Sequence, residues 1–187
     1  MPANRVVETV YLDRSGSYDS FNQATLYKPG ELGARAVDTT SKEYQLVRLD
    51  SGATSATALG VVAANQLAFW KDKTNFIVTN DTVQALGANT VAATNSGFRN
   101  EVAGIFRVAV TAGNYCFVLR KGENVNVKSA SATYQIGDQI VANTGTAADC
   151  NVVAAGTAVV VQSLGTAAGA RVSGNTPTDL NIPNDIS

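Results

Sequence analysis

The chain has 187 residues, an ordinary hydrophobic fraction of 45% and a low charged fraction of 16%. This length is enough to bury the core of one or two domains without disulfide or metal cross-links. Fourteen basic residues oppose fifteen acidic ones, for a net charge of -1, and no basic run is longer than two residues. The sequence therefore lacks the electrostatic footprint of a nucleic-acid-binding protein. Histidine is absent, which removes the commonest general base and the commonest metal ligand.

The two cysteines, Cys116 and Cys150, are too few for a disulfide framework. Cys116 lies in a predicted strand, so we expect a buried free thiol, with a Cys116–Cys150 bridge as the less favoured alternative. The N-terminus has no apolar stretch of signal-peptide length, and no apolar run reaches the ~18 residues of a membrane span. We expect a protein that is made in a cytoplasm and stays there or leaves within a larger assembly.

The N-terminal region predicts an extended arm and a flexible connector. Residues 5–12, RVVETVYL, alternate as an extended segment does. Residues 13–22, DRSGSYDSFN, are polar and rich in glycine and serine, as flexible connectors are. The segment 5–12 is either an edge strand of the main sheet or an arm that pairs with a neighbouring chain by strand addition.

The region after the connector predicts short strands separated by loops. We expect strands at 24–27, 44–49 and 76–79, a turn at Pro29-Gly30 and a polar loop at 50–58. The segment 59–68, LGVVAANQLA, fits either a strand or one to two helical turns. Phe69-Trp70 is a core aromatic pair or an exposed interface anchor.

The clearest strand pattern lies between residues 102 and 141. It predicts a meander with strands at 105–111, 115–120, 124–128 and 134–141, and turns at 112–114, 121–122 and 137–138. Five apolar side chains of this meander are predicted core residues: Phe106, Val108, Val110, Phe117 and Leu119. Beyond the meander we expect a loop at 142–151, a strand at 152–161, a loop at 163–169 and an extended tail at 171–187.

These elements predict an all-β fold with less than about 15% helix, because no segment sustains a 3.6-residue period beyond two turns. A small antiparallel β-barrel, a β-tulip-like domain or a sandwich fits the pattern. The expected organisation is an arm and connector at 1–22, followed by a single β domain at 23–187 with its core at 59–161.

The sequence gives no cue to an active site. No nucleophile lies beside a base, and neither metal-ligand nor phosphate-loop spacing is present. Paired carboxylates far apart in the chain are the one hydrolytic arrangement that the sequence leaves open. We expect no enzymatic activity, no metal and no cofactor.

Two segments are similar to a known pattern. Residues 102–106, VAGIF, and 109–118, AVTAGNYCFV, resemble the capsid decoration, or cement, proteins of tailed bacteriophages. The segment 60–63, GVVA, and the Gly137-Asp138 turn are similar to further features of that group. The resemblance covers about residues 59 to 161 and rests on strand and turn chemistry.

The resemblance implies a β-barrel or β-tulip domain that docks on the outside of a phage head, where major capsid protein subunits meet, and stabilises the shell. It implies a homo-oligomer, with a trimer favoured over a dimer, found on the virion surface after assembly in the bacterial host cytoplasm. No nucleic-acid, membrane or cofactor partner is expected. The candidate capsid or subunit interface comprises Arg5, Val6, Val7, Val10, Tyr11, Leu12, Phe69 and Trp70. The alternative is a receptor- or carbohydrate-binding β module of a phage fibre or tail.

Overall fold

The computed structural model describes residues 18, 21–24, 32–52, 61–81, 101–131, 133–142, 149–156 and 163–182. In these ranges 57% of the residues lie in strands and no helix is present, so the prediction of an all-β protein is confirmed. It follows that no helix of this part of the chain could cross a membrane.

Thirteen strands are described. In chain order they are β1 (Asn22–Gln23), β2 (Arg35–Val37), β3 (Glu43–Leu49), β4 (Val61–Val62), β5 (Leu67–Asp72), β6 (Ile77–Thr79), β7 (Val102–Phe106), β8 (Val110–Thr111), β9 (Tyr115–Lys128), β10 (Gln139–Ala142), β11 (Cys150–Val153), β12 (Ser163–Ala167) and β13 (Asn175–Asn181). Eleven of them form one sheet, and β4 pairs with β8 in a second, smaller one. The large sheet is mixed rather than purely antiparallel, because β3 and β6 run parallel.

The strand pairings form two closed circuits that share β9. In the first, β9 pairs with β3 and β7, β7 with β5, β5 with β6, and β6 with β3. In the second, β9 pairs with β13, β13 with β12, β12 with β10 and β10 with β11. A bridge between Ser129 and Cys150 returns from β11 to the end of β9. We call these circuits the first and the second lobe.

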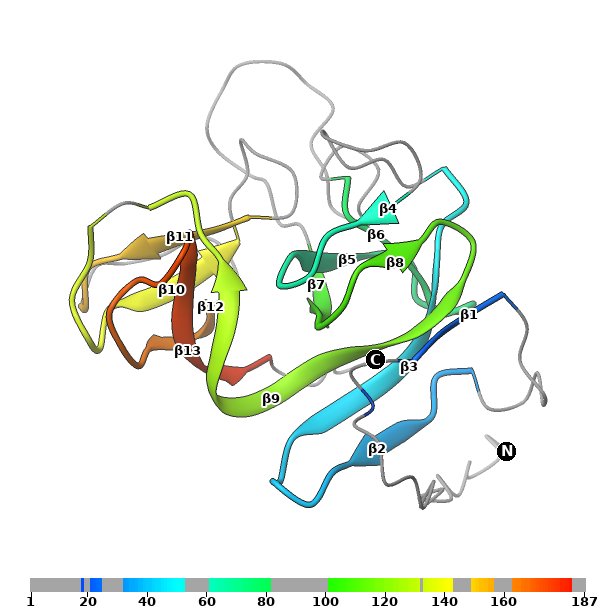
Figure 1. Ribbon diagram of the computed structural model, residues 1–187, viewed down its shortest axis with the longest axis horizontal. Helices are drawn as coiled ribbons and strands as arrows, with labels where there is room; N and C mark the ends of the chain where they lie inside the picture. The colour runs from blue at the N-terminus through cyan, green and yellow to red at the C-terminus, as the bar shows by residue number, and fades with distance from the viewer. Residues whose placement is uncertain are drawn as a thin grey trace, which may run out of the picture.

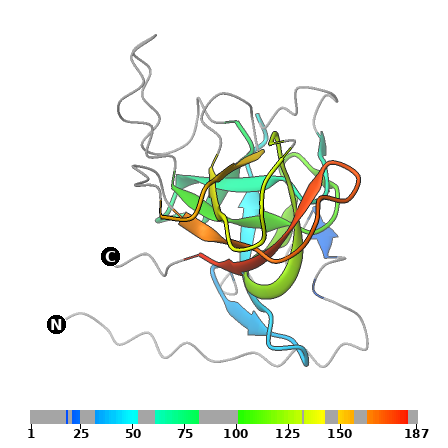
Figure 2. The same ribbon diagram turned by 90° about the vertical axis from the view of Figure 1, so that its left-hand side faces the viewer.

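The two lobes lie side by side, and β9 runs from one to the other (Figure 1). Seen with the second lobe in front, the strands β10 to β13 curve rather than lie flat (Figure 2). Both β3 and β13 pair with β9, so the core extends on both sides of the expected range 59–161.

Alternation along β9 feeds two hydrophobic clusters, because neighbouring side chains of a strand point to opposite faces. Phe117, Leu119, Val125 and Val127 belong to the larger cluster, which fills the second lobe and covers the adjoining face of the first. Cys116 and Val118 point the other way, into the smaller cluster of the first lobe.

The predicted core residues are buried with one exception. Phe106, Val110, Phe117 and Leu119 are at most 5% exposed. Val108 is partly buried and packs against the smaller cluster. The four buried residues divide between the two clusters, although the sequence suggested one core.

The predicted strand at 105–111 is wrong, because β7 ends at Phe106 and β8 begins only at Val110. The backbone of Phe106 is already engaged at this point. Its N–H donates to the carbonyl of Gln66 (2.9 Å), and its carbonyl accepts from the N–H of Asn65 (2.6 Å). These two hydrogen bonds join the end of β7 to the turn before β5, and the strand ends there.

The predicted turn at Lys121-Gly122 is also wrong, because β9 runs through it as one 14-residue strand. Gly122 serves close packing instead. A Cβ atom at this position would lie 2.9 Å from Lys42 Cγ and 3.1 Å from Val125 Cγ2. The predicted turns at Gly113 and Gly137 are confirmed, and both glycines have positive φ, 84° and 93°.

Three predictions for the C-terminal half are corrected. The strand at 134–141 begins only at β10, because a turn occupies its first residues. The loop at 163–169 contains β12, and the tail at 171–187 contains β13, which lies between β12 and β9. Gly165 makes β12 look like a loop, yet a Cβ there would lie 2.0 Å from the Asp179 carbonyl oxygen of β13. Glycine is required for this close strand contact.

Five further expectations have mixed outcomes. The strand at 44–49 is confirmed as β3, and the one at 76–79 as β6. The ambiguous segment 59–68 contains strands and a turn where it is described. Most of the expected strand at 24–27, and the turn at Pro29-Gly30, lie outside the described residues.

Val110→Asp should destabilise the protein strongly, because Val110 is 1% exposed and a carboxylate there is buried without a partner. We expect the free energy of unfolding to fall by about 3 kcal/mol or more in urea titrations. The control is Val172→Asp, at a side chain that is 57% exposed, which should change it by less than about 0.5 kcal/mol. Equal effects of the two substitutions would refute the placement of β8.

Val127→Ala tests whether the lobes unfold together. Val127 is fully buried in the second lobe, and truncating it should cost about 2 kcal/mol. The single tryptophan, Trp70, lies in β5 of the first lobe. Because β9 belongs to both lobes, Trp70 fluorescence and far-UV circular dichroism should report the same shifted transition. A tryptophan transition that stays at the wild-type position would contradict this coupling.

Candidate interaction surface

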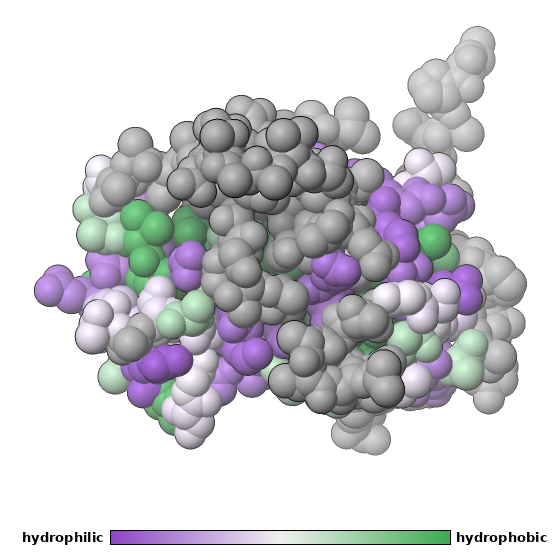
Figure 3. Space-filling view, turned by 90° about the horizontal axis from the view of Figure 1, so that it is seen from above, coloured by the Kyte–Doolittle hydropathy of each residue, from purple (hydrophilic) through white to green (hydrophobic). Residues whose placement is uncertain are grey.

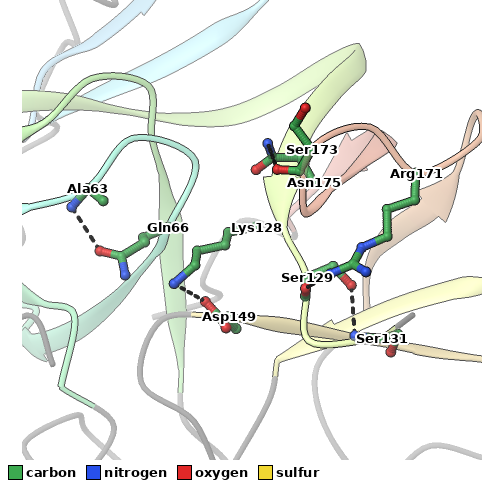
Figure 4. A network of polar contacts seen from close by, with 9 residues as sticks. All are labelled: Ala63, Gln66, Lys128, Ser129, Ser131, Asp149, Arg171, Ser173 and Asn175. Atoms are coloured by element: carbon green, nitrogen blue, oxygen red, sulfur yellow. Dashed lines mark hydrogen bonds and ion pairs between the residues drawn. The ribbon is translucent and has the colours of Figure 1, made fainter. Parts of the chain in front are cut away.

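Polar side chains gather where the end of β9 meets loops of both lobes (Figure 4). They come from the turn at 63–66, the segment 126–131, the residue before β11 and the loop at 171–175. These contacts join the end of the shared strand to segments of both lobes.

Asn65 connects three segments of this junction. It adopts the left-handed backbone conformation (φ 65°), which asparagine tolerates better than most residues. Its side-chain Oδ1 accepts a hydrogen bond from Arg107 Nη1 (2.9 Å), and its carbonyl accepts one from the N–H of Lys128 (2.8 Å). Together with the bond to Phe106, these contacts fasten the turn before β5 to the ends of β7 and β9.

Lys128 and Asp149 form the ion pair of the junction. Lys128 Nζ lies 3.0 Å from Asp149 Oδ1, and the Asp149 side chain is only 10% exposed while that of Lys128 is 43% exposed. The same Asp149 oxygen is buried and accepts no regular hydrogen bond in the described structure. Lys128 is therefore the group that compensates this carboxylate.

Hydrogen bonds made by residues 129–131 close the second lobe. Arg171 Nη2 donates to the Ser129 carbonyl (3.0 Å), and the N–H of Ala130 donates to the Cys150 carbonyl (3.0 Å). Ser131 Oγ accepts from the N–H of Val152 (2.9 Å). These bonds cover the outer edge of β11.

The described cysteine and carboxylate side chains form neither a disulfide nor a metal-binding cluster. Cys116 and Cys150 are both free and buried, and burial raises the pKa of each thiol to about 12. The favoured expectation of a buried free Cys116 is confirmed, and the alternative bridge is not formed. Within the described ranges, no three cysteine or carboxylate side chains come together as a metal site would need. The network is suited to holding the lobes together.

The predicted anchor Phe69-Trp70 is not at the surface. Phe69 is fully buried and Trp70 is 2% exposed, so the core interpretation is confirmed and the interface interpretation is wrong. The two rings point to opposite faces of β5: Phe69 into the larger cluster, Trp70 into the smaller one against Phe76. The other predicted interface residues, Arg5, Val6, Val7, Val10, Tyr11 and Leu12, lie outside the described residues.

The predicted flexible connector contains an anchor that the sequence reasoning missed. The ring of Tyr18 packs on those of Tyr44 (centroids 5.4 Å apart) and Phe117 (5.1 Å), and Phe21 also packs on Phe117 (5.4 Å). Asn22 pairs with Cys116 as part of β1. The N-terminal chain is thus attached to the domain from Tyr18 onward. Two aromatic residues in a stretch of serine and aspartate were the available signal.

The anchor lies beside the edge of the sheet. Tyr44, which contacts Tyr18, pairs with Ala36 of β2, and β2 is the terminal strand of the sheet order. Val37 of β2 is 49% exposed. It is one of three large hydrophobic side chains that the described surface exposes, with Ile136 and Val172. Seen from above, hydrophilic residues are spread over both lobes between the grey parts (Figure 3).

Comparison of the chain with protein-family models, curated proteins and solved structures finds no match.

Substitutions at the ion pair should have unequal effects. Lys128→Met leaves the buried Asp149 carboxylate without a cation and should lower the free energy of unfolding by about 1–3 kcal/mol. Asp149→Asn leaves Lys128, which already reaches solvent, and should cost less than about 1 kcal/mol. In urea titrations the double variant should recover part of the loss of Lys128→Met. Equal losses from the two single changes would show that Asp149 does not depend on Lys128.

Proposed function

We propose that this chain is a capsid decoration protein of a tailed bacteriophage. It binds the outer surface of the head through contacts with the major capsid protein and stabilises the shell. It acts as a homo-oligomer, with a trimer favoured over a dimer, and has no catalytic role. Its place is the virion surface, after assembly in the host cytoplasm.

The observation that carries the proposal is the anchoring of the N-terminal chain beside an open sheet edge. Tyr18 and Phe21 hold this chain against Tyr44 and Phe117, and Tyr44 neighbours β2. The chain before Tyr18 therefore joins the β domain beside the edge strand β2. An arm in this position can pair with a neighbouring subunit, and the assembled lattice offers such partners at high local concentration.

The segments that resemble decoration proteins support the proposal by their position. VAGIF coincides with β7, and AVTAGNYCFV covers β8, the following turn and the start of β9. These strands surround the smaller cluster and include the wall that both lobes share. The resemblance thus lies in the part of the domain on which the rest is built.

The two pairing circuits support a finer interpretation, in which each lobe is a small barrel. A closed circuit pairs every strand on both sides and leaves no free edge inside the lobe. Binding to a capsid would then fall to parts outside the circuits, and of these β2 and the N-terminal arm lie beside the Tyr18 anchor.

The alternative function, a carbohydrate- or receptor-binding module of a fibre or tail, has less support. Sugar platforms use exposed aromatic rings, and the aromatic pair that could have formed one is buried. No aromatic side chain in the described ranges is more than partly exposed.

Deleting residues 2–14 should separate folding from attachment. The deletion retains Tyr18, Phe21 and β1, so the melting temperature of the free protein should change little. Occupancy on purified heads that lack the decoration protein should require at least tenfold more protein, about 1.4 kcal/mol. If the truncated protein unfolds but still binds heads, the arm is a strand of the domain core and does not bridge to a neighbour. Full-length protein that co-purifies with isolated tails and not with heads would favour the alternative function.

A further inference from the structure

We propose that the open edge of β2 binds residues 5–12 of a second copy of this chain by strand addition. The inference rests on the proposed function, which uses the same arm, and it adds the acceptor and the pairing. It concerns contacts between copies of the protein, which can be measured without any capsid.

The hydrogen-bond pattern shows which backbone groups of β2 face outward. The N–H of Asp38 donates to the Lys42 carbonyl (3.0 Å), and the N–H of Leu46 donates to the Ala34 carbonyl (2.9 Å). Bonded pairs alternate with non-bonded pairs in an antiparallel ladder. Ala36 therefore bonds to β3, while the N–H and C=O groups of Arg35 and Val37 point away from it. In the described part of the chain no residue bonds to these outward groups.

The other end of the sheet order is already covered. β11 is the terminal strand there, and its outer edge is engaged by Ala130 N–H and Ser131 Oγ. Since unpaired strand edges are templates for a further strand, β2 is the end of this sheet order that remains for such an addition.

The side chains of β2 match those of the arm. Arg35 and Val37 are exposed on one face, while Ala36 is buried in the larger cluster on the other. In the arm, Glu8 has a valine two residues before it, Val6, and another two residues after it, Val10. An added strand of either direction can therefore place Glu8 beside Arg35 and a valine beside Val37. Opposite charges and apolar residues are favourable neighbours across strands.

The reach of the arm is sufficient for the edge of its own chain and for that of a second copy. Residues 13–17 connect the arm to Tyr18 and can extend over about 17 Å. A strand added to β2 of the same chain would lie only about 10 Å from Tyr44, two strand spacings away. The connector is long enough to span that path, so its length permits either edge, and the proposed homo-oligomer is the reason for assigning the second copy. Pairing within one chain is the competing outcome, and the first experiment below separates the two.

Cysteine cross-linking between two variants tests the contact in trans. A Val37→Cys chain with a size tag is mixed with an untagged Val6→Cys or Val10→Cys chain and oxidised mildly. Cys116 and Cys150 are buried and do not compete. We expect a tagged–untagged disulfide dimer with Val6→Cys if the strands are antiparallel, or with Val10→Cys if they are parallel. Val172→Cys, also exposed, is the control and should give none. Absence of the mixed dimer overturns the proposal. A second sample, a single chain carrying both cysteines, overturns it as well if that chain cross-links only within itself.

Charge reversal tests the side-chain match. Arg35→Glu and Glu8→Arg should each weaken self-association about tenfold in analytical ultracentrifugation, and the double variant should restore it. Val37→Pro should weaken association similarly at an unchanged melting temperature, because it removes an outward N–H that takes no part in the β2–β3 ladder. If the double variant is as weak as the single ones, β2 is not the acceptor. The proposed function is judged separately, by the occupancy of wild-type protein on heads.

Discussion

The structure depends on β9 being one unbroken strand. Its first half gives Cys116 and Val118 to the core of the first lobe, and its second half gives Val125 and Val127 to the core of the second. Within this strand Gly122 lies close to two side chains, because a Cβ there would be 2.9 Å from Lys42 Cγ and 3.1 Å from Val125 Cγ2. A break in β9 would open both circuits at once. The chain therefore forms one mechanical unit, although its pairings describe two lobes.

The polar junction reinforces the same strand from its far end. The Lys128 N–H donates to the Asn65 carbonyl, the Lys128 side chain forms an ion pair with Asp149, and Arg171 donates to the Ser129 carbonyl. Each contact joins the end of β9 to a segment distant in sequence. Their individual contributions are modest, but they fix where the second lobe closes against the first. Only 16% of the residues are charged, and three of them, Lys128, Asp149 and Arg171, make contacts at the end of β9.

Local patterns predicted the β class, the glycine turns and most buried residues, and failed where contacts distant in sequence decide. Gly122 and Gly165 suggested a turn and a loop, yet both lie in strands, close to side chains or backbone that the sequence does not place beside them. Phe69-Trp70 was open to two interpretations because β5 has a core on each face, which removes the polar alternation that marks a surface strand. The anchoring role of Tyr18 likewise depends on Phe117, about a hundred residues away in the chain.

The closed circuits also explain why a short edge such as that of β2 could matter. A protein that pairs nearly all its strand edges internally is protected against uncontrolled strand addition. β2 has three residues and offers few hydrogen bonds, so one added strand binds weakly. Weak contacts become effective when several are made at once, because the second and later contacts form at high local concentration. An arm rooted at Tyr18 beside such an edge would associate free copies weakly and hold them more firmly within a regular array, as the proposed function would require.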